Sequence, residues 1–389
     1  MTILPRIDAH AAELTAIYKD LHAHPELGFE EVRTAGIVAA RLREWGVDEV
    51  HENFGGTGVV GVIKGKGRGN RCVGLRADMD ALPVTEETGL AHASTVPGKM
   101  HACGHDGHTT MLLGTAKYLA ETRDFDGTVV LIFQPAEEGQ GGARRMVEEG
   151  LFERFPCDEI YGMHNSPNGK PGTMAICKGA AMAGAAFFDI QVNGVGSHAA
   201  QPHQSRDPLL AAASIAMELQ TIHSRNMAPL DTLVLSVTQI HAGTAYNVVP
   251  QTASLCGTIR YFRDEVFQMA ERRMKEICAG FALAHGISIE VNVRNAFNVL
   301  MNDADLSDAY LDAARDILGP DAVDGASAPT TGSEDFADML QVVPGAYCRV
   351  GHSGTMPLHN PGFWLGTEVL PVGASIMARL VERRLPLEA

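Results

Sequence analysis

The sequence lacks a basic excess, a long apolar run and a paired cysteine motif. Its 389 residues include 31 Lys and Arg against 47 Asp and Glu, a formal charge of −16 with His neutral. A chain this acidic lacks the positive surface that supplies most non-specific nucleic-acid affinity. No stretch approaches the roughly 18 uncharged apolar residues that cross a bilayer. We therefore expect no nucleic-acid partner and no membrane partner.

Disulfides and an export signal are also not expected. The seven cysteines are widely spaced, odd in number and without a CxxC pair, which favours free thiols in a chain this long. Most of them should be buried apolar residues. The first residues, MTILPRIDAHAAEL, place charged residues and a proline where a signal peptide needs an apolar block. We expect a soluble, cytoplasmic protein.

Several common catalytic motifs are absent or incomplete. The sequence contains neither HExxH nor GxxxxGK[ST], which excludes a helix-borne zinc protease site and a P-loop. GTGVVG at residues 56–61 fits GxGxxG, but the following VIKGKGRG cannot begin a helix. That segment predicts a hairpin. GHSGT at residues 351–355 lacks the last glycine of GxSxG, so a serine hydrolase is not supported.

The first half of the chain alternates between strand and helix patterns. Short Val/Ile/Leu-rich runs predict buried strands, and three- to four-residue apolar spacing predicts helices. The strands are expected at 58–63, 71–78, 127–135 and 159–165, and the helices at 5–23, 30–45, 107–121 and 142–150. This alternation predicts an α/β fold with a mostly parallel central sheet flanked by helices. Its ligand crevice should lie outside the carboxyl ends of the strands.

A different order begins near residue 184. Strand and helix patterns follow as 187–194, 207–224, 232–240, 252–262, 264–285 and 287–294. This βαββαβ order is that of a ferredoxin-like domain. After residue 296 the α/β pattern resumes, with helices at 303–318 and 367–384 and a strand at 345–350. We predict a catalytic domain of residues 1–183 and 296–389 that carries an inserted domain of residues 184–295.

Polar clusters follow the predicted strand ends. They are RADMDALP (76–83), MHACGHDGH (100–108), QPAEEG (134–139) and GMHN (162–165). A fifth cluster, PLHNPGF (357–363), places His359 between two prolines. Imidazole, carboxylate and thiolate together suit Zn²⁺ and other borderline divalent ions. Two such ions about 3.5–4 Å apart can activate a water molecule. We therefore expect a divalent metal site at this edge of the sheet.

Two adjacent carboxylates are especially informative. Side chains that neighbour each other in an extended or turn segment diverge, so one of Glu137 and Glu138 can ligate metal while the other acts as a general base. The alternative is a solvated pair of surface acids. For Cys103, which has His101 and His105 two residues away on either side, the alternative is a buried free thiol.

A set of motifs in fixed order resembles a known family. RADMDALP, MHACGHDGH, QPAEEG, GMHN, GSHAAQPH, YNVVP, GTIRYF, GSEDF and PLHNPGF occur in this order and cover almost the whole chain. The chain resembles the aminoacylase and hippurate-hydrolase branch of the co-catalytic zinc metallopeptidases, which includes the auxin-amino-acid conjugate hydrolases. The resemblance implies two divalent metal ions per subunit, which could be Zn, Mn, Co or Ni.

The resemblance also implies roles for individual residues. The implied metal ligands are Cys103, His105, Glu138, His164 and His359. Glu137 would be the general base, and Asp80 would orient and tune the metal site. The role of Asp78 stays open, because the wider superfamily has a His at that position. No role is assigned to Glu334 and Asp335 of the GSEDF segment.

The inserted domain of similar proteins acts as a lid and mediates dimerisation. By that analogy His198 would stabilise the oxyanion and Asn247 would hold substrate, both in the active site of the neighbouring subunit. Arg260 would bind the free carboxylate of the amino-acid half, although a strand-face ion pair is an alternative. A homodimer or a dimer of dimers is expected.

The expected activity is metal-dependent hydrolysis of the amide bond in small N-acyl or N-aroyl amino acids. The same chemistry would serve a dipeptidase or an N-acetyl- or N-succinyl-diaminopimelate deacylase. A relative that binds metal or ligand without catalysis is the alternative from another class.

Overall fold

The structure is a computed structural model that describes residues 1–167 and 169–387. It contains two compact units. The first, here called the α/β unit, comprises Met1–Ala181, Leu300–Ala328 and Asp335–Ala389. The second, here called the inserted unit, comprises Met182–Val299 and Pro329–Glu334. The short segment Pro329–Glu334 thus groups with the inserted unit, although the sequence analysis assigns it to the part after residue 296.

The α/β unit is built on a mixed sheet. Over the described residues its eight strands have the order β1-β2-β4-β3-β5-β16-β6-β15. The strands are β1 (Glu49–Phe54), β2 (Gly58–Lys64), β3 (Cys72–Asp78), β4 (Thr128–Gln134), β5 (Glu159–Ser166), β6 (Met174–Ala175), β15 (Val323–Asp324) and β16 (Gly345–Gly351). Strands β4, β3, β5 and β16 are parallel to their neighbours in that series. The predicted α/β fold with a parallel centre is confirmed.

The edge of this sheet contains the predicted hairpin. Strands β1 and β2 pair in antiparallel fashion, and β2 also pairs antiparallel with β4. The GTGVVG segment forms the turn and the start of β2. The prediction of a hairpin in place of a nucleotide-binding loop is therefore confirmed.

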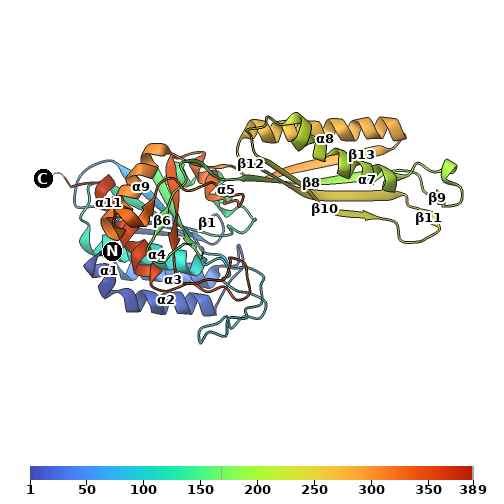
Figure 1. Ribbon diagram of the computed structural model, residues 1–389. Helices are drawn as coiled ribbons and strands as arrows, with labels where there is room; N and C mark the ends of the chain where they lie inside the picture. The colour runs from blue at the N-terminus through green and yellow to red at the C-terminus, as the bar shows by residue number, and fades with distance from the viewer. Residues whose placement is uncertain (168, 388–389) are drawn as a thin grey trace. The chain divides into compact units, whose positions relative to one another are not determined.

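Helices flank the sheet (Figure 1). They are α1 (Pro5–Ala9), α2 (Ala11–Ala23), α3 (Val32–Glu44), α4 (His105–Thr122), α5 (Gly142–Glu148), α6 (Leu151–Arg154), α9 (Ala304–Leu318), α10 (Phe336–Leu340) and α11 (Val369–Arg384). The main core joins apolar residues of α1 to α4, α9 and α11 with one face of the sheet. All residues of β3 are buried, including the charged Arg76 and Asp78 that follow its apolar first half. The predicted helix 5–23 is divided at His10, which separates α1 from α2.

The inserted unit has the predicted ferredoxin-like arrangement. Its elements are β8 (Gly184–Asn193), α7 (Pro208–Glu218), β10 (Leu233–Ala242), β12 (Thr252–Tyr261), α8 (Asp264–His285) and β13 (Ser288–Phe297). The sheet order is β10-β12-β8-β13, and every pairing in it is antiparallel. Burial alternates along β12, because one face of the sheet packs against α7 and α8. A separate small sheet pairs β9 (Ser197–His198) with β11 (Val248–Val249).

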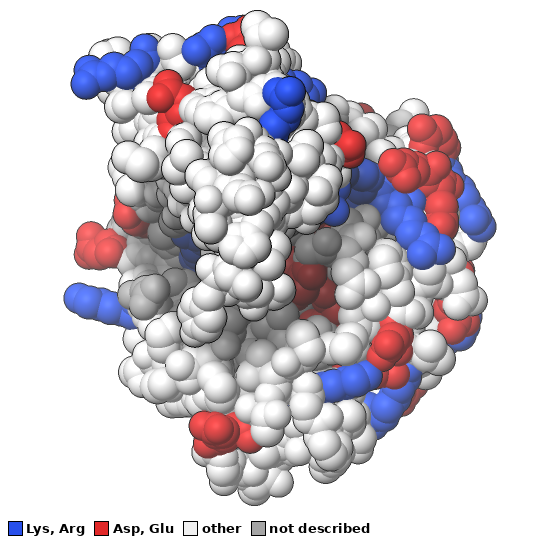
Figure 2. Space-filling view, turned by 90° about the vertical axis from the view of Figure 1, so that its right-hand side faces the viewer, with Lys and Arg blue, Asp and Glu red and all other residues white. Residues whose placement is uncertain are grey.

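Minor elements complete the fold. They are β7 (Gly179–Met182), β14 (Leu300–Asn302), η1 (Pro202–Gln204), η2 (Ile222–Asn226) and η3 (Pro320–Ala322). All seven cysteines are free, although the Sγ atoms of Cys72 and Cys157 lie 3.9 Å apart. No helix in the described ranges is long and apolar enough to cross a membrane. Figure 2 shows Lys and Arg side chains interspersed with Asp and Glu on the face in view.

Candidate metal centre

The carboxyl ends of the central strands bring four of the polar clusters together. Strand β3 ends at Asp78, and β4 ends three residues before Glu137. His164 lies near the end of β5, and α4 begins at His105, two residues after Cys103. Because carboxyl ends of adjacent parallel strands lie at the same edge of a sheet, these residues meet there.

Among the described residues, five groups of side chains could each hold a metal ion, and three of them overlap at Cys103, His105 and Glu138. These three are Cys103–His105–His164, Cys103–Glu138–His359 and His105–Glu137–Glu138, and within each group the ligand atoms lie within 4.8 Å of one another. Cys103, His105 and Glu138 each belong to two of these three groups. Shared ligands of this kind suit two neighbouring divalent ions.

The chemistry of the donor atoms fits a divalent cation. His105 Nε2 is buried and has no hydrogen-bond partner among the described residues. Oxygen atoms of Glu137 and Glu138 lie 4.0 and 3.9 Å from it. Ligands about 2.0–2.2 Å from a shared ion are separated by such distances. A cation would therefore satisfy a buried nitrogen that is otherwise costly to leave unpaired.

Burial affects the thiol and one imidazole in opposite directions. It raises the pKa of Cys103 well above the usual thiol value, so the free thiol stays protonated. A coordinated cation would instead stabilise the thiolate. Burial lowers the pKa of His164, which favours the neutral imidazole that binds metals. Its Nε2 lies 3.4 Å from Cys103 Sγ.

The segment after β4 turns sharply to present the two glutamates. Ala136 has a left-handed backbone with φ 53°, and its N–H donates to the buried Glu31 at 2.8 Å. The Glu138 N–H donates to Asp80 Oδ2 at 2.9 Å. These contacts fix the backbone on both sides of Glu137, which is only 7% exposed. The alternative of two solvated surface acids does not fit this burial.

Asp80 orients two of the candidate ligands at once. Its Oδ1 accepts a hydrogen bond from His105 Nδ1 at 3.1 Å, and its Oδ2 accepts the Glu138 N–H. The first contact leaves His105 Nε2 available to a metal. Carboxylate partners of this kind fix the tautomer and direction of ligating imidazoles.

His359 comes from a loop and is half-exposed. Its backbone is left-handed with φ 65°, which is uncommon for a residue with a side chain. Its N–H donates to the Ala102 carbonyl at 2.7 Å, and its Nε2 lies 3.2 Å from Glu138 Oε1. The backbone contact ties this loop to the segment that leads into Cys103.

His108 lies in a polar cluster that the sequence analysis singled out but received no role there, and Asn165 was not considered as a site residue. His108 donates from Nδ1 to Asp78 at 2.6 Å, and its Nε2 accepts the Asn165 N–H at 2.9 Å. Asp78, His105 and His108 also form a possible metal group. However, both nitrogens of His108 are already used by hydrogen bonds. The only signal for Asn165 was its place directly after His164 in GMHN.

A second buried cluster supports the start of α4. His22 on α2 donates to Asp106 Oδ2 at 2.6 Å, and its Nε2 lies 3.3 Å from Glu86 Oε1. Burial alone would lower the pKa of His22, but the bonds and charges of Asp106 and Glu86 raise it to about 10. The charged imidazole thus joins α2, the first turn of α4 and the loop that contains Glu86.

This cluster gives a stability prediction with a defined sign. Because the folded-state pKa of His22 exceeds its ordinary value, its stabilisation is complete below about pH 6.5 and is lost as pH rises through about 10. His22→Ala should cost about 3 kcal/mol near pH 6, and less at pH 9.5. Urea unfolding of both proteins at these two pH values measures the difference. His24→Ala, at the half-exposed end of the same helix, is the control. An equal cost of His22→Ala at both pH values would contradict the assignment.

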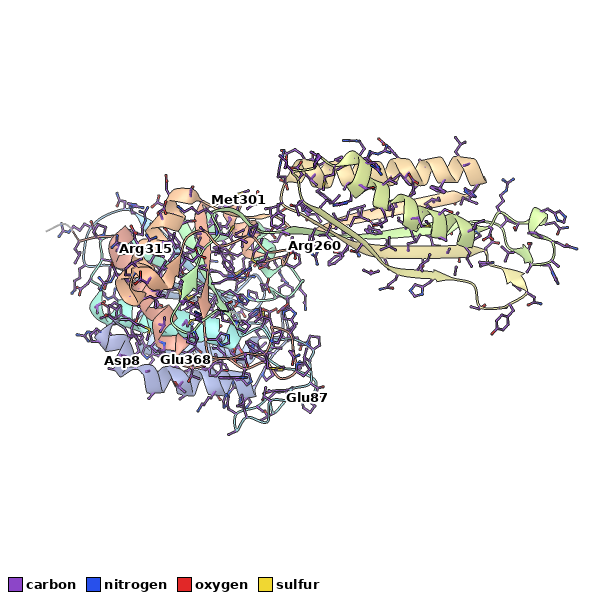
Figure 3. All side chains as sticks on the ribbon, viewed as in Figure 1. Asp8, Glu87, Arg260, Met301, Arg315 and Glu368 are labelled. Atoms are coloured by element: carbon purple, nitrogen blue, oxygen red, sulfur yellow. The ribbon has the colours of Figure 1, made fainter. Side chains whose placement is uncertain are left out.

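The inserted unit brings two of its three candidate residues together. His198 on β9 pairs with Val248 on β11, and the Asn247 carbonyl accepts the Ala199 N–H at 3.0 Å. Both His198 and Asn247 are exposed. Arg260 lies near the end of β12 (Figure 3), eight residues beyond its first residue, or roughly 26 Å along an extended strand. Within this unit, Arg260 is therefore remote from the other two.

The Arg260 side chain is partly buried and lies beside an aromatic ring. Among the residues that the structure describes, no ion pair involves it, and its buried Nη1 has no hydrogen-bond partner. Its guanidinium lies 5.9 Å from the centre of the Phe187 ring, and burial lowers its pKa. The alternative of a strand-face ion pair is not what the structure shows.

A parallel-centred sheet with thiolate, imidazole and carboxylate donors at its strand ends, interrupted by a ferredoxin-like unit, defines a class of metal-dependent hydrolases. Comparison with known proteins agrees. Residues 74–383 match the model of peptidase family M20/M25/M40. The chain belongs to this family.

Individual relatives cover nearly the whole chain. A hippurate hydrolase of Campylobacter jejuni is 40% identical over 385 residues, which are 99% of this chain and 100% of that protein. An N-acetylcysteine deacetylase of Bacillus subtilis is 39% identical, with 96% of this chain and 97% of that protein covered. A Bacillus subtilis crystal structure described as a dinuclear metal binding peptidase of the M20 family is similar, with a TM-score of 0.85 and 35% identity. It covers 97% of this chain and 99% of that chain.

These findings confirm the family resemblance and the expectation of an enzyme. The protein is a hydrolase that acts on amide bonds and uses divalent metal ions.

Proposed function

We propose that the protein hydrolyses the amide bond of small N-acyl or N-aroyl amino acids to a carboxylic acid and a free amino acid. The observation that carries this proposal is the overlap of three ligand groups at Cys103, His105 and Glu138, with the buried Glu137 beside them. The relatives named hippurate hydrolase and N-acetylcysteine deacetylase support the substrate class.

Five residues would hold the metal ions, and two others would serve them. Cys103, His105, Glu138, His164 and His359 are the proposed ligands. Bound zinc, manganese, cobalt or nickel would act as a Lewis acid and lower the pKa of water. Glu137 would take the proton of the attacking water and return it to the leaving amine. Asp80 would hold His105 and Glu138 in place.

The substrate would be recognised by residues of the inserted unit. His198 would donate a hydrogen bond to the developing oxyanion, and Asn247 would hold the substrate. We propose that both serve the neighbouring subunit of a homodimer or a dimer of dimers. The fully exposed Leu230 and Tyr246 support a subunit contact in this unit, because large exposed apolar side chains often mark interfaces.

Mixing of inactive subunits tests this shared site. Glu137→Ala and His198→Ala proteins should each be nearly inactive alone. Their hybrid dimers should regain activity, because one site then combines an intact Glu137 with an intact His198. Activity after subunit exchange, followed by mass spectrometry of the intact complexes, measures this. Complete exchange without recovered activity would contradict the shared site.

Arg260 should recognise the substrate carboxylate. Replacing it with Met should lower kcat/KM by about 10- to 100-fold for a substrate with a free carboxylate, because a charge-assisted hydrogen bond is lost. The amide derivative of the same substrate lacks the charge and should lose much less. Steady-state kinetics with both substrates measure the effect. Equal losses on both would contradict a carboxylate-binding role.

A substrate panel tests the proposed activity. N-acetyl and N-benzoyl amino acids, dipeptides and N-succinyl-diaminopimelate should be assayed side by side with added Mn²⁺, Co²⁺ or Zn²⁺. The proposal expects N-acyl or N-aroyl amino acids to give the highest kcat/KM. A preference for dipeptides or diaminopimelate derivatives would favour those alternatives. A flat response across all metals and substrates would favour a non-catalytic relative.

A further inference from the structure

A fully buried arginine lies between two carboxylates in the α/β unit. The Arg76 side chain on β3 is 0% exposed, and its Nη1 donates to Asp78 Oδ2 at 2.8 Å. Its Nη2 donates to Asp335 Oδ1 at 3.2 Å, and its Nε donates to Gln134 Oε1 at 2.7 Å. Buried charges persist only where their geometry and remaining hydrogen bonds are satisfied. This arrangement therefore fixes Arg76 and both carboxylates.

Asp335 accepts hydrogen bonds from residues of three different elements. Besides Arg76, it accepts hydrogen bonds from Gln134 Nε2 at 2.7 Å and from the Ala143 N–H at 3.0 Å. These donors come from β3, the end of β4 and the first turn of α5. The next residue, Phe336, places its ring 5.5 Å from the Arg76 guanidinium. Asp335 thus anchors the start of α10 beneath the strand ends.

The second carboxylate, that of Asp78, connects Arg76 to residues nearer the metal centre. Asp78 accepts from His108 Nδ1 at 2.6 Å, and His108 Nε2 accepts the Asn165 N–H at 2.9 Å. Because Nε2 is an acceptor, the proton of a neutral His108 lies on Nδ1, facing Asp78. One orientation of the ring satisfies both contacts.

Asn165 then contacts two candidate ligands. Its side-chain Nδ2 donates to the Cys103 carbonyl at 2.6 Å. Its own carbonyl accepts from His164 Nδ1 at 2.6 Å, which leaves His164 Nε2 directed at the metal centre. The close approach requires a glycine next to Cys103. Gly104 has φ 88°, and a Cβ there would lie 2.4 Å from Asn165 Nδ2.

We propose that Arg76 and Asp335 are positioning residues for the metal centre, acting through Asp78, His108 and Asn165 on Cys103 and His164. The inference rests on the proposed metal centre and extends it. It gives a role to Asp78 and Asp335, which the sequence left without one. Partners of this kind set ligand orientation, and their loss weakens metal binding about 10- to 100-fold.

The test compares two aspartates of the same region. Asp335→Asn removes the charge that faces Arg76. Asp338→Asn is the matched control, because Asp338 is also buried, lies on α10 and pairs with Arg144 at 3.1 Å, away from β3. Asn165→Asp changes the far end of the network, where it replaces the donor to the Cys103 carbonyl by an acceptor. It keeps the inference testable if Asp335→Asn does not fold.

Cobalt binding provides a readout that a merely structural role would not change. For Asp335→Asn and Asn165→Asp we expect the Co²⁺ dissociation constant to rise at least tenfold. The absorption band that arises from charge transfer between the thiolate and cobalt should also change. With cobalt at saturation, kcat should fall while KM changes little. Asp338→Asn should keep cobalt affinity and spectrum within about twofold of wild type, even if its Tm falls.

Two results would overturn the inference. One is unchanged cobalt affinity and spectrum in the folded Asp335→Asn or Asn165→Asp protein. The other is an equal effect of Asp338→Asn, which would show general destabilisation. Failure of the proposed function can be distinguished from failure of this inference. In that case the wild-type protein would bind cobalt but would hydrolyse no amide in the panel.

Discussion

Replacing Glu137 by glutamine should lower kcat by about 10²- to 10⁴-fold without loss of bound metal. Glutamine keeps the size of the side chain but cannot accept a proton from water. Glu137 is buried, and its Oε2 lies 4.0 Å from His105 Nε2, beside the proposed ligands. The measurement is kcat with an N-acyl amino acid, together with the metal content of the purified variant.

The neighbouring residue provides the matched control. Glu138 lies within ligand distance of Cys103 and His359 as well as of His105, which are all proposed ligands, so Glu138→Gln should lose metal as well as activity. A Glu137→Gln enzyme with near-normal kcat would contradict the role of general base. Loss of metal from Glu137→Gln to the same extent as from Glu138→Gln would instead make Glu137 a ligand.

Removal of the divalent ions should abolish turnover, and their return should restore it. Within each candidate ligand group of this site the donor atoms lie within 4.8 Å of one another, close enough to share one ion. Dialysis against a chelator should reduce activity to about 1% or less, since the metal ions supply most of the activation of water. Titration with Mn²⁺, Co²⁺, Zn²⁺ or Ni²⁺ then measures recovery and identifies the preferred ion.

The Cys103→Ala variant tests whether this metal dependence involves the proposed thiolate ligand. Because Cys103 contributes to two metal groups, the variant should need a much higher metal concentration for recovery and should recover incompletely. A buried cysteine outside the site, Cys348, provides the comparison, and Cys348→Ala should recover like wild type. Full activity of the chelated wild-type enzyme, or unchanged metal dependence of Cys103→Ala, would contradict the account.

Local sequence patterns predicted most of the fold. Strands such as β2 and β4 consist almost entirely of apolar residues and are bounded by turns, as strands buried on both faces should be. The inserted unit was equally predictable, because the patterns of its six elements follow one another in the βαββαβ order. The two-residue strands β6 and β15 were not predicted, since they carry too few residues to show a period.

The candidate site was predictable only in part. The motifs indicated the donor side chains, because chemically distinctive residues follow each strand end. The hydrogen bonds that orient them were not predictable. Arg76 and Asp335 are 259 positions apart, and they meet because β3 and the start of α10 pack together. His108 and Asn165 are likewise joined by tertiary structure, 57 positions apart.

The central claim is that Cys103, His105, Glu138, His164 and His359 hold two divalent ions. Anomalous X-ray diffraction from crystals of the manganese-loaded protein tests it most directly. We predict two anomalous peaks about 3.5–4 Å apart, with these five side chains as protein ligands. A single peak, no peak, or ions bound by Asp78 and His108 in their place would contradict the claim.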